Sequence, residues 1–163
     1  MNANAFRYLF DYHFTENLRL WVEYVTLLPF ELFIKDSEYS HGSVRDQLVH
    51  LISVDEIWFS EIRGVPSLEP LPPSDVDNRE IIRTHWSRVE KGMQEYLVNL
   101  RDDNLFEKPI NEPEEDQVLF VWQVLLHVIN HGTDHRAQLL RQLHDLGIKT
   151  TAQDLIFYVY DHP

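Results

Sequence analysis

Apolar residues recur at three- and four-residue steps along most of this chain, which is the spacing that lines up side chains on one face of an α-helix. The pattern predicts four long helices, at residues 4–28, 43–63, 79–100 and 118–146. Pro29, Gly64 and Gly147 stand where three of these helices are expected to end. The last stretch, residues 152–163, is compatible with either a short helix or an extended segment.

Two polar connections separate the later helices, namely residues 65–78, which are rich in proline, and residues 101–117. Ser43 is a suitable N-cap for the second helix because Asp46 follows three residues later. Four long amphipathic helices in a chain of 163 residues predict one all-α domain, a four-helix bundle that spans residues 1–163. Both long connections allow a crossover, so a simple up-down-up-down order is not required.

The composition removes several classes of function. The chain has no cysteine, which excludes disulfides, thiolate metal ligands and a cysteine nucleophile, and which fits a reducing cytosol. Its net charge of −13 disfavours binding to nucleic-acid backbones. No apolar run reaches the roughly 18–20 residues that a membrane span needs, and the N-terminus does not resemble a signal peptide. We therefore expect a cytoplasmic protein that binds neither nucleic acid nor membrane.

Histidines at four-residue steps mark the fourth predicted helix, at His127, His131 and His135. Residues four apart lie one turn apart on a helix face, so two such imidazoles can bind one metal ion, as in the HExxH motif. His131 and His135 lie at the margin of the apolar face, whereas His127 is turned further toward the polar side. The spacing leaves two interpretations open, metal ligands or ordinary surface histidines.

Other polar residues occupy informative positions on the first two helices. His50 projects away from the main apolar stripe of the second helix, so it is an ordinary polar position unless Val54 and Ile57 form a second face packed against the fourth helix. His13 and Asn17 fall one turn apart on the apolar face of the first helix. They are either a hydrogen-bonded core pair or the lining of a pocket, because buried polar groups need partners.

Two further expectations concern single residues. Asp55 lies within the apolar stripe of the second helix, where a salt bridge to an arginine such as Arg19 or Arg136 is the simplest explanation. Four more histidines have no partner at helical spacing, and we expect them to be solvated: His41, His85, His144 and His162.

Three segments of the chain resemble motifs of one family. WQVLLHVINHGTDHRAQ, residues 122–138, is similar to the C-terminal motif of the DinB-like (DinB/YfiT) proteins, which approximates H-x-x-N-H-G-x-H-H-R-G-Q. The Leu-Gly and the later Asp of that motif correspond to residues 146–147 and to Asp154. SVRDQLVHLISVDEIWF, residues 43–59, resembles the second-helix motif, and YHFTENLRLW, residues 12–21, resembles the first-helix motif. The similarity covers most of the chain.

The resemblance implies an up-down-down-up four-helix bundle, often dimeric, with a divalent metal held by one histidine from the second helix and two from the fourth. Carried over by position, these ligands are His50, His131 and His135, and this assignment overrules the doubt about His50. Zinc or nickel is the expected metal, although imidazole also suits copper and iron. Asp134 replaces a second consecutive histidine of the family and Ala137 replaces a glycine, but neither position has ligand spacing.

A three-histidine metal with open positions can activate water or bind and deprotonate a thiol. Characterised branches of the family use low-molecular-weight thiols, as S-transferases or as a thiol-dependent isomerase. The resemblance therefore implies a metal-dependent transferase or hydrolase acting on a small molecule, with thiol transfer preferred. His13, Asn17, His127 and Asp134 are candidates for lining the pocket or orienting the ligands. The alternative is a non-catalytic bundle for binding or dimerisation, with a structural or vestigial metal site.

Overall fold

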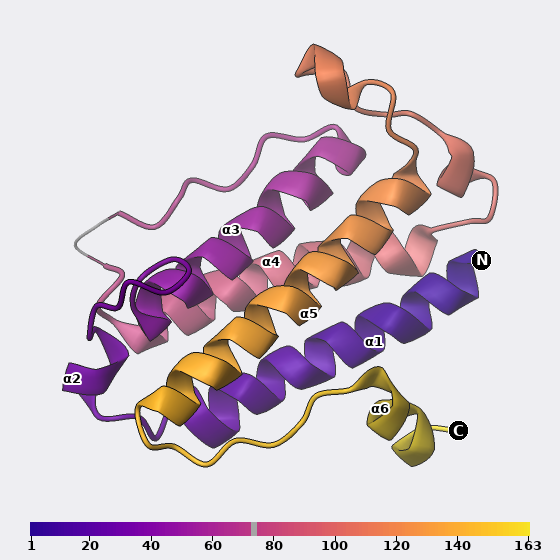
Figure 1. Cartoon of the computed structure of the whole chain (residues 1–163). Helices are drawn as coiled ribbons and strands as arrows, with labels where there is room; N and C mark the ends of the chain where they lie inside the picture. The colour runs from indigo at the N-terminus through magenta and orange to yellow at the C-terminus, as the bar shows by residue number, and fades with distance from the viewer. Residues whose placement is uncertain (73–74) are drawn as a thin grey trace.

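The protein, seen in a computed structural model that describes residues 1–72 and 75–163, consists of helices joined by loops (Figure 1). The long helices are α1 (Ala3–Leu20), α3 (Val44–Arg63), α4 (Arg79–Asn99) and α5 (Val121–Asp145). The short elements are η1 (Trp21–Val25, a π-helical turn), α2 (Phe30–Phe33), the 3₁₀ turns η2 (Asn104–Phe106) and η3 (Glu114–Asp116), and α6 (Leu155–Asp161). The described residues contain no strand, so the all-α class is confirmed.

Local capping interactions define the ends of α3 as the sequence predicts. The Ser43 side chain accepts a hydrogen bond from the backbone N–H of Asp46, and the Asp46 carboxylate accepts one from the backbone N–H of Ser43. Gly64 ends the helix with a φ of 63°, in the left-handed region that favours glycine. The register of His50 on α3 is therefore determined by signals at both ends of the helix.

Two predicted boundaries are wrong. The first helix does not continue to Leu28, because η1 follows α1 and Pro29 then opens a separate short helix, α2. A π-helical turn holds more residues per turn than an α-helix, so the three- and four-residue spacing of apolar positions does not reveal it. The fourth predicted helix starts at Val121 instead of Val118, because residues 114–116 form their own 3₁₀ turn.

The apolar faces of the four long helices meet in one core. Its fully buried members include Phe6, Phe10, Leu48, Phe59, Trp86, Met93, Leu125, Val128 and Leu139. Helix α5 packs against α3 and α1, and α4 packs against the same two helices. Each long helix therefore has two principal neighbours, and the α3–α5 groove lies across the bundle from the α1–α4 groove.

Long connections cross the outside of the bundle. In Figure 1 the chain leaves α3, runs back along the length of the molecule and only then enters α4. The irregular loop predicted here is seen at residues 65–72, whereas Pro73 lies outside the described residues. After α5 the tail runs beside α1, where the Tyr12 hydroxyl donates to the carbonyl of Gln153 at 2.6 Å, and it ends in α6. None of the helices in the described part of the chain is long and apolar enough to cross a membrane.

Candidate metal centre

His50 from α3 meets His131 and His135 from α5 in the groove between these two helices. The Nε2 atoms of His50 and His131 are 3.3 Å apart. The ring centroid of His135 lies 4.1 Å from that of His131 and 4.7 Å from that of His50. The structure thus brings together the three residues named from the family resemblance. The buried second face expected on α3 is only partly formed, because Ile57 is exposed.

A fourth imidazole, from His41 in the loop before α3, lies at the same place. Its ring stacks on that of His50 with a centroid distance of 3.6 Å and an interplanar angle of 18°. His41, His50 and His135 each offer a ligand atom within 4.8 Å of the other two, and His131 is not part of this group. His41 is exposed, as expected, but its contacts with His50 and His135 were not foreseen, because helical spacing carries no information about a residue in a loop.

The two candidate sets share His50 and His135 and differ in whether His131 or His41 is the third member. Two nitrogens that share a tetrahedral metal at about 2.0–2.1 Å lie about 3.3–3.4 Å from each other. The separation of 3.3 Å between His50 and His131 matches this value, although it is also the length of a hydrogen bond between the two rings. His41, His50 and His135 offer ligand atoms that all lie within 4.8 Å of one another, and His131 does not join that group. The family resemblance names His131 as the third ligand, and the geometry adds His41 as a rival candidate.

Burial keeps these rings neutral near pH 7. Burial first, and then the neighbouring imidazoles, lower the pKa of His50 to about 4 and the pKa of His131 to about 3. The pKa of His135 is also lowered, first by burial and then by His41. Neutral imidazole is the form that binds a metal, so the cluster is in its ligand form without losing protons.

Unpartnered nitrogens provide a separate test of whether a metal fits here. The Nδ1 atoms of His131 and His135 are buried and have no hydrogen-bond partner among the described residues. A buried polar atom without a partner costs about 1–3 kcal/mol, so such atoms are uncommon unless a bound group completes the site. A metal on Nε2 of His131 would leave the Nδ1 of that ring unpartnered, so of these two atoms only Nδ1 of His135 is available to such an ion. Close neutral rings fit a divalent metal, and an all-imidazole donor set suits zinc, nickel, copper and iron.

A buried polar network lies beside the histidines, between α1, α3 and α5. Nε2 of His13 and Oδ2 of Asp55 are 3.2 Å apart, and both side chains are fully buried. Nη1 of Arg136 contacts Nδ1 of His13 at 3.2 Å and donates to Oδ1 of Asn17 at 2.9 Å. Because the guanidinium can only donate, Nδ1 of His13 must accept, and its Nε2–H therefore donates to Asp55. Burial lowers the pKa of His13, which keeps the ring neutral.

This network decides between the two interpretations of His13 and Asn17. They are hydrogen-bonded core residues, although Arg136 connects them and they do not bond to each other. The direct salt bridge expected between Asp55 and an arginine is replaced by a hydrogen bond from the neutral His13 ring, and Arg136 is linked to Asp55 through that ring. Sequence analysis named Arg136 only as one possible partner of Asp55, whereas the structure places it at the centre of the network.

His127 and Asp134 lie on the solvent side of α5. The ring of His127 packs edge-on against Trp58, with centroids 5.2 Å apart, and its centroid is 5.7 Å from that of His131. The Asp134 carboxylate accepts a hydrogen bond from Gln138 at 2.9 Å. Within the described part of the chain, neither residue hydrogen-bonds to the rings of His131 or His135.

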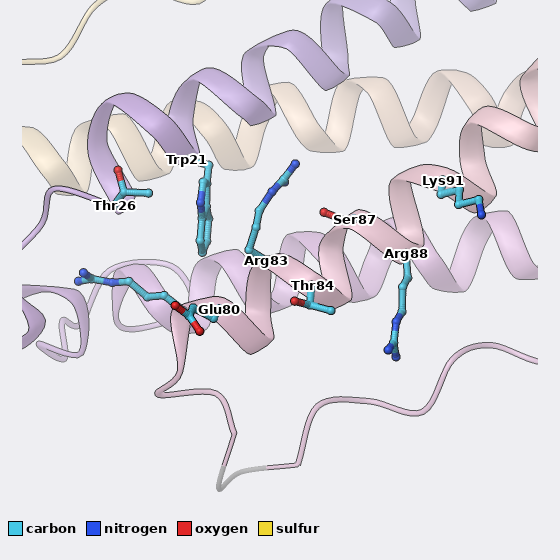
Figure 2. A pocket seen from close by; sticks show the side chains of 9 residues that line it. Trp21, Thr26, Glu80, Arg83, Thr84, Ser87, Arg88 and Lys91 are labelled. Carbon is cyan, nitrogen blue, oxygen red and sulfur yellow. The ribbon is translucent and has the colours of Figure 1, made fainter.

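A cavity of about 840 Å³ opens between η1 and α4, away from the histidines (Figure 2). Figure 2 shows Trp21 extending from the end of the upper helix toward α4, and Arg83 extending from α4 toward the upper helix. The other lining residues are Thr26, Arg79, Glu80, Thr84, Ser87, Arg88 and Lys91. Although this cavity is large enough for a small molecule, it contains none of the clustered histidines and so does not adjoin the candidate metal centre.

The whole chain was compared with known protein families and with curated proteins. The model of the DinB family matches residues 1–162. No curated protein matches the chain significantly. The family resemblance of the three motifs is therefore confirmed, and it extends over the connections between them.

Proposed function

Since the chain belongs to the DinB family, we propose that it is a metal-dependent enzyme acting on a small molecule at a centre formed by His50, His131 and His135. One observation carries this proposal. Nε2 atoms from residues 81 positions apart lie 3.3 Å from each other, which is the separation of two nitrogens on one metal, and the His135 ring lies beside them. Zinc or nickel is the proposed ion.

A divalent metal bound there would supply Lewis acidity toward a thiol or a water molecule. The chain itself supplies neutral imidazole lone pairs and holds their directions through the packing of α3 against α5. Because His41 and His127 are exposed at the edge of the cluster, a small substrate can approach from that side. On the opposite side, the network of His13, Asp55 and Arg136 fills the interior and excludes water.

Thiol S-transfer is the proposed reaction, with hydrolysis as the second choice. The chain has no cysteine, so the sulfur comes from a low-molecular-weight thiol cosubstrate. The thiol loses its proton, its sulfur forms a bond to an electrophilic carbon of the second substrate, and a leaving group departs with the bonding electrons. Family membership supports this choice over other reactions.

Elemental analysis of single-residue variants tests the centre. His50→Ala and His131→Ala should each lose nearly all of the bound metal, because two imidazoles alone bind it weakly. His127→Ala is the matched control from the same helix and should keep one metal per chain. The proposal is wrong if His127→Ala loses the metal while His50→Ala retains it. Thiol consumption with an aryl halide as electrophile should fall in parallel with the metal content.

A non-catalytic bundle with a structural metal remains the second candidate, because His41 places a fourth imidazole beside the other three. Structural metal sites are normally closed by a fourth protein ligand, whereas catalytic sites keep a position open. If added thiol leaves the spectrum of the cobalt-substituted protein unchanged, this second candidate is correct.

Three broader features belong to the same proposal. We propose a homodimer, supported by family resemblance, and no affinity for nucleic acid, supported by the net charge of −13. We propose the up-down-down-up order for the long helices, supported by the return connection that precedes α4. A cytoplasmic location is supported by the lack of cysteine, which fits a reducing compartment.

A further inference from the structure

We propose that His41 is an exchangeable fourth ligand of the metal centre, which completes the coordination at rest and withdraws when a substrate binds. This inference rests on the proposed function of the centre. It goes beyond the three helix-borne histidines, because His41 lies on a loop and outside each segment that carries the family motifs.

The position of the ring supports this role. The His41 ring stacks on His50 at 3.6 Å, and its centroid is 5.3 Å from that of His135. Ligand atoms of these three residues lie within 4.8 Å of one another. Two ligands of one metal are separated by about 3.3–3.4 Å, and their lone pairs lie in the ring planes, so the His41 side chain would have to rotate out of its stack on His50 to bring a nitrogen into the coordination sphere. His41 is exposed, whereas His50 and His131 are half-buried and His135 is buried, so His41 stands on the solvent side of the cluster.

The backbone around His41 is tied to both helices that carry the other histidines. The amide oxygen of Gln47 on α3 accepts hydrogen bonds from the Ser40 hydroxyl at 2.9 Å and from the His41 N–H at 3.3 Å. Gln142 on α5 donates to the carbonyl of Gly42 at 2.6 Å. Gln47 is only 1% exposed and Gln142 only 6%, so these are buried amides committed to holding the loop.

The ring itself is held much less firmly than the backbone. Among the described contacts, the His41 side chain makes ring contacts with His50 and His135 but no hydrogen bond. Gly42, the next residue, has a φ of 90°, which is a conformation that favours glycine and fixes the turn into α3. A fixed backbone with a free imidazole is the arrangement expected of a ligand that binds and leaves by side-chain rotation, without movement of the loop.

An exchangeable ligand reconciles the two candidate functions of the centre. Four imidazoles would close the coordination sphere as in a structural site, whereas withdrawal of His41 would open one position as a catalytic site requires. A thiolate is an anionic, soft donor that zinc and nickel accept, so it can displace a neutral imidazole. Substrate binding would then open the centre only when a suitable ligand is present.

Cobalt(II) substitution of the full-length protein tests this inference. His41→Ala should still bind one cobalt per chain, but about ten- to a hundredfold more weakly in competition with a chelator, in the range seen when support for a metal site is removed. Its visible absorption should differ from that of the wild type, because one nitrogen donor is replaced by water. His41→Phe keeps a ring for stacking but offers no nitrogen, so it should behave like His41→Ala. His144→Ala, an exposed histidine near the end of α5, is the matched control and should behave as wild type.

Titration with 2-mercaptoethanol then tests exchange. A sulfur-to-cobalt charge-transfer band should appear in both proteins, and His41→Ala should need several-fold less thiol because no imidazole competes.

If His41→Ala and wild type have the same affinity, spectrum and thiol titration, His41 is not a ligand. If His41→Phe restores wild-type behaviour, the ring only packs. If His41→Ala loses the metal while His131→Ala retains it, His41 is a permanent ligand and exchange is refuted. Failure of the wild type itself to bind cobalt or zinc would instead refute the proposed function.

Discussion

At the scale of single residues, Arg136 and Asp55 form a buried pair of opposite charges with the neutral ring of His13 between them. Both charged side chains are fully buried. Arg136 donates a hydrogen bond to His13, and His13 donates one to Asp55. Both hydrogen bonds therefore point from the arginine toward the carboxylate. Each charge therefore depends on the other for compensation in a region without solvent.

Removing either charge alone should be strongly destabilising. Asp55→Leu and Arg136→Leu should each lower the free energy of unfolding by about 3–5 kcal/mol, because each leaves an uncompensated buried charge. The double variant should cost clearly less than the sum of the two. Urea denaturation of the four proteins forms a double-mutant cycle, and Glu115→Ala, at an exposed position, serves as a neutral control. Additive losses would show that the two charges are independent.

At the scale of helices, the close approach of α1 to α5 depends on Gly132. A Cβ atom at this position would lie 2.4 Å from Cε1 and 2.6 Å from Nδ1 of His13, both in a fully buried ring. The glycine therefore lets His13 reach Arg136, which is one turn further along α5. The close packing of α5 against α1 at Gly132 also fixes where His131 and His135 lie relative to α1.

Gly132→Ala should destabilise the protein by about 1–3 kcal/mol, the usual cost of overpacking a core, even though alanine is the better helix former by about 1 kcal/mol. Gly92→Ala is a matched control within α4, because the added Cβ would meet only the flexible end of Arg63. That variant should be neutral or slightly stabilised. Thermal unfolding of both variants checks this prediction, which fails if the two glycines respond alike.

At the scale of the whole molecule, the histidines make the metal-free protein sensitive to acid. The pKa values of His13, His50, His131 and His135 are all lowered in the folded state, in each case mainly by burial. In the unfolded chain these groups return to a pKa of about 6.5. Between the folded and unfolded values the unfolded chain binds more protons, so acid favours unfolding in that range.

The free energy of unfolding of the metal-free protein should therefore be greatest above about pH 6.5 and should fall as the pH drops from about 7 to 5. Urea denaturation after treatment with a chelator measures this dependence. A variant carrying both His50→Ala and His131→Ala should show a shallower dependence over the same range, because two of the shifted groups are gone. Stability that is flat or rises on acidification would contradict the prediction.

The sequence by itself determined the all-α class, the family and the ends of α3 and α4. These features depend on local signals, namely apolar periodicity, the capping residue Ser43, and Gly64. It also identified the histidine pair on α5, because a helix places residues four apart on one face whatever surrounds it.

Spacing within one helix did not decide which other side chains join that pair; the family resemblance named His50, and the tertiary structure added His41. The wheel of α3 alone places His50 away from its apolar stripe, and packing against α5 is what brings its Nε2 within 3.3 Å of His131. The place of His41 in the cluster was missed because it depends on hydrogen bonds between its loop and two helices, one accepted by Gln47 on α3 and one donated by Gln142 on α5. The partner of Asp55 likewise depends on the packing of α1 against α3, which brings His13 within 3.2 Å of the carboxylate. Contacts between residues far apart in the chain depend on how helices pack, and no local spacing encodes that.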